Sequence, residues 1–115
     1  MVTPRRGEIY WVNLDPTVGS EIRKKRPALV VSNDAANKKY HQVTVIPLTS
    51  RRPDQAEPFQ ILLPTEETGL SKDSKALAEQ IRTVSKLRLQ GRVGRIDPSK
   101  QEEVDKALKL HLDLE

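Results

Sequence analysis

The chain has 115 residues, which fits one domain with a single compact core, so we expect one domain over residues 1–115. It contains no cysteine, which excludes disulfides and thiolate metal sites and favours a reducing cytoplasm. No stretch is apolar over the length that a membrane span needs. The low aromatic content argues against a single-strand binder built on a platform of stacked bases.

Basic residues concentrate in the first half of the chain. The net charge is +4, yet residues 1–52 carry ten Lys and Arg against four Asp and Glu, whereas residues 53–115 carry ten against twelve. A one-sided basic surface favours a polyanionic partner, either a nucleic acid or an acidic protein segment. Charge alone leaves both partners open.

The first half of the chain alternates strand-forming runs with turn signals. β-branched and aromatic residues between Gly and Pro signals predict strands over 7–14, 27–33 and 42–50. A long loop follows the first strand, because Asp15-Pro16 opens a turn and Gly19 permits unusual backbone angles. The connection over 33–39 has room for one helical turn. Pro47 indicates a bulge or a sheet edge in the third strand.

The second half is more ambiguous until its last segment. We expect strands over 59–64 and 91–96, with a short helix over 85–89. Residues 75–85 favour helix by propensity, but their alternating pattern and neighbouring strands favour a strand, which is our prediction.

A C-terminal helix is the clearest element. Asp97 or Ser99 is a candidate N-cap, Pro98 suits the first turn, and Glu102 completes a capping box with Ser99. One helical face then carries Val104, Ala107, Leu108, His111 and Leu114. Several short strands closed by one helix indicate a mainly β fold, a small and strongly bent barrel.

The sequence lacks the residue patterns that most kinds of catalytic site require. His41 and His111 stand apart from any carboxylate pattern at metal-ligand spacing, so we expect an exposed His41 and a half-buried His111 that packs. No serine lies in a nucleophile elbow, and "GSEIRKKRP" lacks the glycine spacing of a Walker loop. We therefore expect no metal and no cofactor.

Catalysis that only orients a substrate and stabilises its charge remains possible, and RNA is a substrate that such catalysis can cleave. The RNA 2′-hydroxyl is itself a nucleophile, so the protein needs only to orient the phosphate, stabilise the added negative charge and manage two protons. An arginine can fork onto the phosphate oxygens, and a hydroxyl can supply a further donor. Arg26 could take this role, because Pro27 and the strand after it fix its backbone, or it could be one more solvated cation of the basic loop over 23–26, and the residues alone leave both open.

The motifs of this chain resemble one known family. In order, "RRGEIYWVNLDPTVGSE", "KKRPALVVSND", "VIPLTS" and "ALAEQIRTVSKLRL" are similar to the MazF/PemK toxins of bacterial type II toxin–antitoxin systems. The resemblance covers nearly the whole chain. It implies an SH3-like barrel with a C-terminal helix, in a homodimer. The implied activity is a metal-independent, sequence-specific endoribonuclease that cuts single-stranded mRNA, leaves a 2′,3′-cyclic phosphate and a 5′-hydroxyl, and inhibits translation and growth.

The resemblance also implies roles for individual residues. Arg26, before the proline of the RP motif, and Thr49, in "PLTS", correspond to the catalytic pair of the family. Glu21 of the GSE motif could accept the 2′-hydroxyl proton or anchor its loop, and both roles stay open. The EQIRT block is a strand in the family, which places Glu79, Gln80 and Arg82 near the substrate groove and the dimer interface. The implied RNA-binding residues are Ser20, Arg23, Lys24, Lys25, Ser50 and Gln80.

Two further expectations and two alternatives accompany this reading. We expect Arg23 to Lys25 to form a solvated, mobile segment that steers RNA and also receives the acidic, disordered tail of a cognate antitoxin. Several family members have small or neutral residues there, so the basic run puts the substrate preference in doubt. The alternatives are a CcdB-like toxin that binds DNA gyrase without cutting RNA, and a non-catalytic RNA-binding module.

Overall fold

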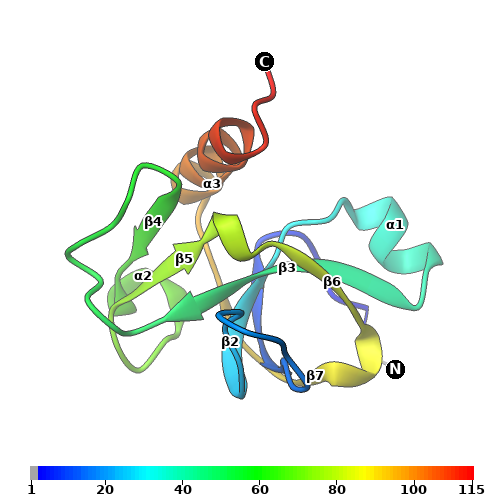
Figure 1. The fold of residues 1–115 in the computed structure, drawn as a ribbon. Helices are drawn as coiled ribbons and strands as arrows, with labels where there is room; N and C mark the ends of the chain where they lie inside the picture. Colours follow the sequence, from blue (N-terminus) through cyan, green and yellow to red (C-terminus); the bar gives the residue numbers. More distant parts are fainter. Residues whose placement is uncertain (1–2) are drawn as a thin grey trace.

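The computed structural model describes residues 3–115 as a bent β-sheet with a long helix at the C-terminal end (Figure 1). Its strands are β1 (Glu8–Asn13), β2 (Lys25–Val30), β3 (Gln42–Thr49), β4 (Gln60–Leu63), β5 (Ser74–Leu77), β6 (Arg82–Ser85) and β7 (Leu89–Arg95). Its helices are α1 (Asp34–Lys39), α2 (Thr65–Thr68) and α3 (Pro98–His111), with 3₁₀ turns η1 (Ala78–Gln80) and η2 (Lys86–Arg88).

All the strand pairs are antiparallel, and β3 is the centre of the sheet. The strand order is β4-β5-β3-β2-β1-β7, and β6 also pairs with β3. This arrangement confirms the predicted mainly β fold with a C-terminal helix. The helical turn predicted over 33–39 is also confirmed as α1.

Pro47 occupies a different place from the predicted bulge or edge. On one side of β3, residues up to Val45 pair with β6, and residues from Leu48 onward pair with β5. Pro47 lies in the interval between these two partners, and on its other side it is opposite Ala28 of β2. A residue without an N–H fits this position because one edge of the strand changes partner there.

The segment 75–85 is only partly the predicted strand. It divides into β5, the turn η1 and β6, so Glu79 and Gln80 lie in a 3₁₀ turn while Arg82 and Thr83 lie in a strand. The chain turns here because β5 and β6 pair with different ends of β3. The alternating pattern therefore predicted the two strands and missed the break between them.

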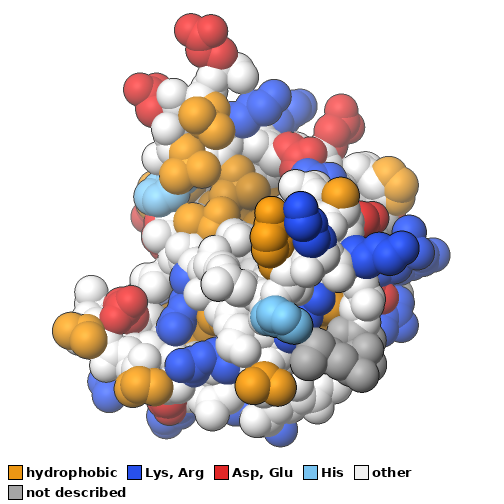
Figure 2. All heavy atoms as spheres, turned by 90° about the vertical axis from the view of Figure 1, so that its right-hand side faces the viewer, with side chains coloured by type: hydrophobic (Ala, Val, Ile, Leu, Met, Phe, Trp, Pro, Cys, Tyr) orange, Lys and Arg blue, Asp and Glu red, His pale blue; other side chains and the backbone are white. Residues whose placement is uncertain are grey.

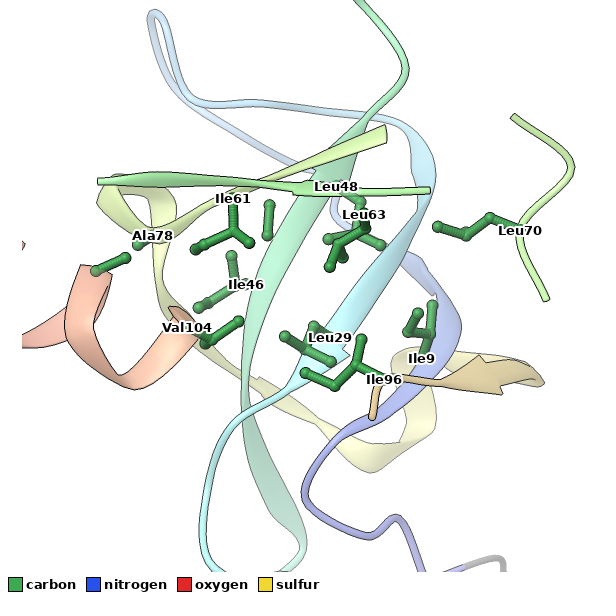
Figure 3. Close-up of a cluster of buried hydrophobic side chains, with 12 residues drawn as sticks. Ile9, Leu29, Ile46, Leu48, Ile61, Leu63, Leu70, Ala78, Ile96 and Val104 are labelled. Carbon is green, nitrogen blue, oxygen red and sulfur yellow. The ribbon is translucent and has the colours of Figure 1, made fainter. Parts of the chain in front are cut away.

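Period-two alternation places a hydrophobic core on each face of the central strands. On one face, Leu29 of β2 packs with Ile9 and Ile46, and Val104 of α3 covers this cluster (Figure 3). On the other face, Ala28 and Val30 pack with residues of β1, β3 and β6. Arg26 has the same phase as Ala28 and Val30, whereas Pro27 has the phase of Leu29. Consecutive residues at the start of β2 therefore lie on opposite faces.

The helix α3 begins as the sequence predicts, with one difference. Asp97 is the N-cap, and its carboxylate accepts a hydrogen bond from the Lys100 N–H at 2.8 Å. The predicted capping box between Ser99 and Glu102 is absent from the described hydrogen bonds, because the Ser99 hydroxyl donates to Asp97 instead. Among residues 3–115, no helix has both the length and the apolar character to cross a membrane.

Candidate active site

Arg26 and Thr49 lie at the ends of two paired strands. Arg26 is the second residue of β2, and Thr49 is the last residue of β3. These strands pair from Val30 opposite Val45 to Ala28 opposite Pro47, so Arg26 and Thr49 each lie two residues beyond the last paired position, at the same end of the two strands. Both residues line one pocket. The two residues that the sequence predicts to be catalytic are therefore neighbours.

These two side chains share a pocket of about 380 Å³, which we call the Arg26 pocket. Its lining residues are Ser20, Ile22, Arg26, Thr49, Arg51, Arg52, Gln60, Lys75, Leu77, Glu79 and Gln80. Four of them are cationic and one is a carboxylate. The excess of positive charge in a concave site suits an anionic ligand such as a phosphodiester.

The Arg26 guanidinium is held by one of its nitrogens and keeps the others available. Its Nε donates a hydrogen bond to the Arg23 carbonyl oxygen at 2.7 Å. This contact leaves the two terminal nitrogens free to fork onto two oxygens of a phosphate. An arginine fixed in this manner loses little side-chain entropy when it binds an anion.

The Thr49 hydroxyl is oriented by a contact with the next loop. Its Oγ1 accepts a hydrogen bond from the Arg51 N–H at 3.2 Å, as is common at the start of a turn. Because the oxygen accepts there, the hydroxyl hydrogen stays available for an oxygen atom in the pocket. Thr49 can therefore act as a neutral donor beside the charged donor Arg26.

The loop between β1 and β2 is tied to the rest of the barrel. The Ile22 N–H donates to Gln80 Oε1 at 3.3 Å, the Leu14 N–H donates to the Lys24 carbonyl at 3.1 Å, and Arg82 donates to the Leu14 carbonyl at 3.0 Å. Lys25 belongs to β2. The basic run from Arg23 to Lys25 is thus more closely held than the mobile segment that the sequence predicts.

Glu21 lies apart from the predicted catalytic pair. Its Oε1 accepts a hydrogen bond from the Val18 N–H at 2.6 Å, and its own N–H donates to the Val18 carbonyl at 3.2 Å. It does not line the Arg26 pocket. These contacts favour the anchoring role of Glu21 over proton abstraction.

Glu79 enters the Arg26 pocket from the turn η1. Its Oε2 accepts a hydrogen bond from Gln60 Nε2 at 2.7 Å, while its buried Oε1 has no hydrogen-bond partner among residues 3–115. Glu79 Oε1 is shielded from solvent, so it does not contact a substrate in the pocket. Glu79 instead holds Gln60 at the pocket wall.

The predicted RNA-binding residues divide between two pockets. Ser20 and Gln80 line the Arg26 pocket, whereas Lys24, Lys25 and Ser50 line a neighbouring pocket of about 510 Å³. We call this second one the Trp11 pocket; it is lined by Trp11, Lys24, Lys25, Arg26, Pro27, Leu48, Ser50, Gly69, Leu70, Ser71, Lys72, Ser74 and Val93. Arg26 borders both pockets, and the exposed Arg23 lines neither.

Several lining residues escaped the sequence analysis. Arg51 and Arg52 directly follow the "PLTS" motif in the basic half of the chain, and this adjacency to Thr49 was a usable signal. Lys75, Gln60 and Lys72 come to the pockets only through the pairing of β3, β4 and β5 and the loop before β5, which no local pattern encodes.

The histidines lie outside both pockets. His41 is exposed, as predicted, but His111 is also exposed rather than half-buried, and its ring lies 6.1 Å from the Phe59 ring. His111 stands at the last turn of α3, beyond the residues that the sheet covers. Within residues 3–115, no three side chains of His, Asp or Glu gather in a group that could hold a metal ion.

Comparison with known proteins agrees with this geometry. The family model of the PemK-like, MazF-like toxins of type II toxin-antitoxin systems matches residues 5–112. The endoribonuclease MazF9 of Mycobacterium tuberculosis is 49% identical to this chain, and the match covers 96% of the chain and 97% of the relative.

Solved structures give the same result for the fold. Crystalline MazF from Deinococcus radiodurans superposes with a TM-score of 0.86 at 28% identity, covering 99% of this chain and 100% of that one. An endoribonuclease from a Mycobacterial species, solved with its cognate antitoxin, superposes with a TM-score of 0.81 at 26% identity and 97% coverage of both chains. The gyrase-binding alternative is not favoured by these matches. The chain therefore belongs to the PemK-like, MazF-like toxins of type II toxin-antitoxin systems, and its activity is that of an endoribonuclease.

Proposed function

We propose that the chain cuts single-stranded RNA, mRNA in particular, in the Arg26 pocket without a metal ion. The observation that carries this proposal is the pairing of a fixed arginine with a threonine hydroxyl in a pocket of four cationic side chains and one carboxylate. The lack of a grouped metal-ligand set among residues 3–115 is consistent with it. As a toxin, the enzyme would inhibit translation and growth by destroying mRNA.

The chemistry follows from the order in which charge develops. The RNA 2′-oxygen gives up its proton to solvent water, attacks the adjacent phosphorus, and forms a phosphorane with additional negative charge. The bond from phosphorus to the 5′-oxygen then breaks and that oxygen takes up a proton from water, leaving a 2′,3′-cyclic phosphate on one fragment and a 5′-hydroxyl on the other.

Arg26 is the main stabiliser in this scheme. Its terminal nitrogens fork onto the phosphorane oxygens, and such preorganised donors are worth about 10²–10³ in rate. Because arginine stays protonated, Arg26 suits charge stabilisation rather than proton abstraction. Thr49 adds a neutral donor, and Glu21 orders the loop that carries Ser20.

The partners of the chain follow from its family and its surface. We propose a homodimer and an antitoxin with an acidic, disordered tail that covers the basic run from Arg23 to Lys25. Hydrophobic side chains gather on the surface near α3 (Figure 2), and Leu110, Leu112 and Leu114 at the end of the chain are exposed. Exposed apolar patches mark protein contacts and support this proposal. We place the protein in the bacterial cytoplasm, where mRNA is found.

The test is the chemistry of the cut ends. Protein treated with excess EDTA is incubated with a long metal-free RNA, and the fragments are analysed for terminal groups. We expect undiminished cleavage with 2′,3′-cyclic phosphate and 5′-hydroxyl ends, and no cleavage when the scissile nucleotide is 2′-deoxy. Loss of cutting in EDTA, or 5′-phosphate ends, would show that the proposed reaction is wrong.

A further inference from the structure

The Trp11 pocket carries chemistry that the catalytic pair does not use. It adjoins the Arg26 pocket, because Arg26 borders both. Its lining includes the cationic side chains of Lys24, Lys25, Lys72 and Arg26 and no carboxylate. A chain of phosphates held at Arg26 would therefore meet a second positively charged hollow directly beside the first.

Trp11 supplies an aromatic surface in this hollow. It lies in β1 opposite Pro27 of β2, so the two side chains share the face of the strand pair that carries Ile9 and Leu29 further along. The ring is 40% exposed although most large apolar side chains of the central strands are buried. The Lys25 ammonium lies 5.7 Å from the ring centroid, which keeps a cation against one side of the indole.

The far wall of the pocket comes from a close contact between α2 and β7. A Cβ at Gly94 would lie 1.9 Å from the Thr68 carbonyl oxygen, so only glycine allows the backbones to approach this closely. The contact brings Gly69, Leu70 and Val93 to the pocket that Trp11 also lines. One aromatic ring, apolar side chains and four cations thus line a single hollow of about 510 Å³, which has room for one base.

We propose that the Trp11 pocket binds a nucleotide that flanks the scissile phosphate, with its base against Trp11 and its phosphate near Lys25 and Lys72. The inference rests on the proposed cleavage at Arg26. We favour RNA over an acidic peptide for two reasons. An RNA strand whose phosphate is bound at Arg26 can continue directly into the Trp11 pocket, because Arg26 lines both pockets. The indole of Trp11 also offers a base a stacking partner. The few aromatic residues exclude an extended stacking platform, but a single base needs a single ring.

Tryptophan fluorescence tests this placement directly, because Trp11 is the one tryptophan of the chain. The cut site is mapped first, and RNAs with a 2′-deoxy scissile nucleotide are then titrated while binding is followed by a label on the RNA. We expect the emission to change with RNA that extends on both sides of the cut, and to stay unchanged with RNA truncated at the cut on one of the two sides. Unchanged emission at saturation with the long RNA would overturn the proposal, as would a response to polyglutamate peptide but not to RNA.

A matched pair of double variants gives the second test. Trp11→Leu/Lys72→Gln removes the stacking surface and one cation of the Trp11 pocket. Tyr40→Leu/Lys39→Gln removes the same kinds of side chain outside both pockets, an aromatic residue that is 55% exposed and one lysine. The readout is the ratio of kcat/KM for the long RNA to that for the truncated RNA. We expect the first variant to lower this ratio between about 5- and 100-fold and the second to leave it unchanged.

The two failures are distinguishable. If RNA is not cut at all, the proposed function is wrong; if RNA is cut and the ratio is the same in all variants, only the Trp11 subsite is wrong. Trp11→Phe, which keeps an aromatic face, should restore most of the ratio even if Trp11→Leu disturbs the fold. A Trp11→Phe protein that folds, by circular dichroism, and behaves like the leucine variant would also contradict stacking.

Discussion

The Arg26 pocket and a larger pocket elsewhere on the molecule each contain four cationic side chains, and of these two only the Arg26 pocket has the net positive charge to hold an anion. In the Arg26 pocket, Arg26, Arg51, Arg52 and Lys75 face a single carboxylate. A larger pocket of about 660 Å³, here called the Arg92 pocket, is lined by Arg5, Arg6, Gly7, Glu8, Asp34, Glu67, Arg92, Arg95, Ile96, Asp97, Pro98 and Gln101. It holds four arginines and four carboxylates.

Three of the four arginines of the Arg92 pocket are already engaged in ion pairs. Arg92 pairs with Glu8 at 2.6 Å, Arg6 pairs with Asp105 of α3, and Arg5 approaches Asp34 at 3.9 Å. These pairs join the start of β1 to β7, α3 and α1, which makes the pocket a junction of elements. The volume of a pocket therefore says little about its function here. The difference between the numbers of cationic and carboxylate side chains distinguishes a binding site from a junction that only joins elements.

The largest effect should come from Arg26→Ala compared with Arg92→Ala. Removing Arg26 should lower kcat about 10²–10³-fold or more, because the main charge opposite the phosphorane is lost. Arg92→Ala should leave kcat unchanged and reduce stability by no more than about 1 kcal/mol, because its ion pair is half exposed. Single-turnover cleavage and thermal melts measure both. Similar cleavage by the two variants would dismiss Arg26 as catalytic.

A smaller effect is expected from Thr49→Ala. A neutral donor stabilises an anion less than a guanidinium does, so kcat should fall roughly 10-fold. Thr49→Ser keeps the hydroxyl and should recover most of the rate. If Thr49→Ala costs more than Arg26→Ala under the same single-turnover conditions, then the hydroxyl is the main stabiliser and the roles are reversed.

The sequence could predict those features of this site that depend on residues close together in the chain, and it could not predict those that depend on strand pairing. Pro27 and the apolar runs predicted strands close to Arg26 and Thr49, although β2 spans Lys25–Val30 rather than 27–33, and the family motifs identified the pair. The break at Glu79 and the arrival of Lys75 were not visible, because they depend on β5 and β6 pairing with different ends of β3. Nor could charge counting distinguish the two pockets, because the neutralising carboxylates come from β1, α1, α2 and the start of α3.

The basic run should affect binding rather than the chemical step. Arg23→Gln/Lys24→Gln/Lys25→Gln should lower the log–log salt slope of RNA binding by roughly 2, since each lost contact to a single strand contributes about 0.7. The loss should appear in KM, because the Arg23 carbonyl that holds Arg26 is backbone and survives the substitution. The variant should also bind its antitoxin more weakly.

The matched control for the basic run is Arg5→Gln/Arg6→Gln/Arg95→Gln. It removes the same formal charge from the Arg92 pocket, where carboxylates already balance the arginines. We expect its salt slope to stay near that of the wild type. A kcat that collapses in the first variant with KM unchanged would place the run inside the catalytic site.

The smallest expected effect concerns the structural role of the Arg92 pocket and should leave cleavage unchanged. Asp97 caps α3, and the Lys100 N–H, followed by the Ser99 hydroxyl, holds the pKa of its carboxyl below the ordinary value. A depressed folded-state pKa adds stability that is present above the unfolded value of about 3.9 and is lost as the pH falls through the folded value. Asp97→Ala should therefore lower Tm by roughly 5 °C at neutral pH and by less below about pH 4. Asp97→Asn keeps a hydrogen-bond acceptor at the cap and should lower Tm less than Asp97→Ala does.

Thermal melts of the three proteins across this pH range, with cleavage measured in parallel, test this role of Asp97. If Asp97→Ala lost its kcat and kept its Tm, the Arg92 pocket would belong to the active site.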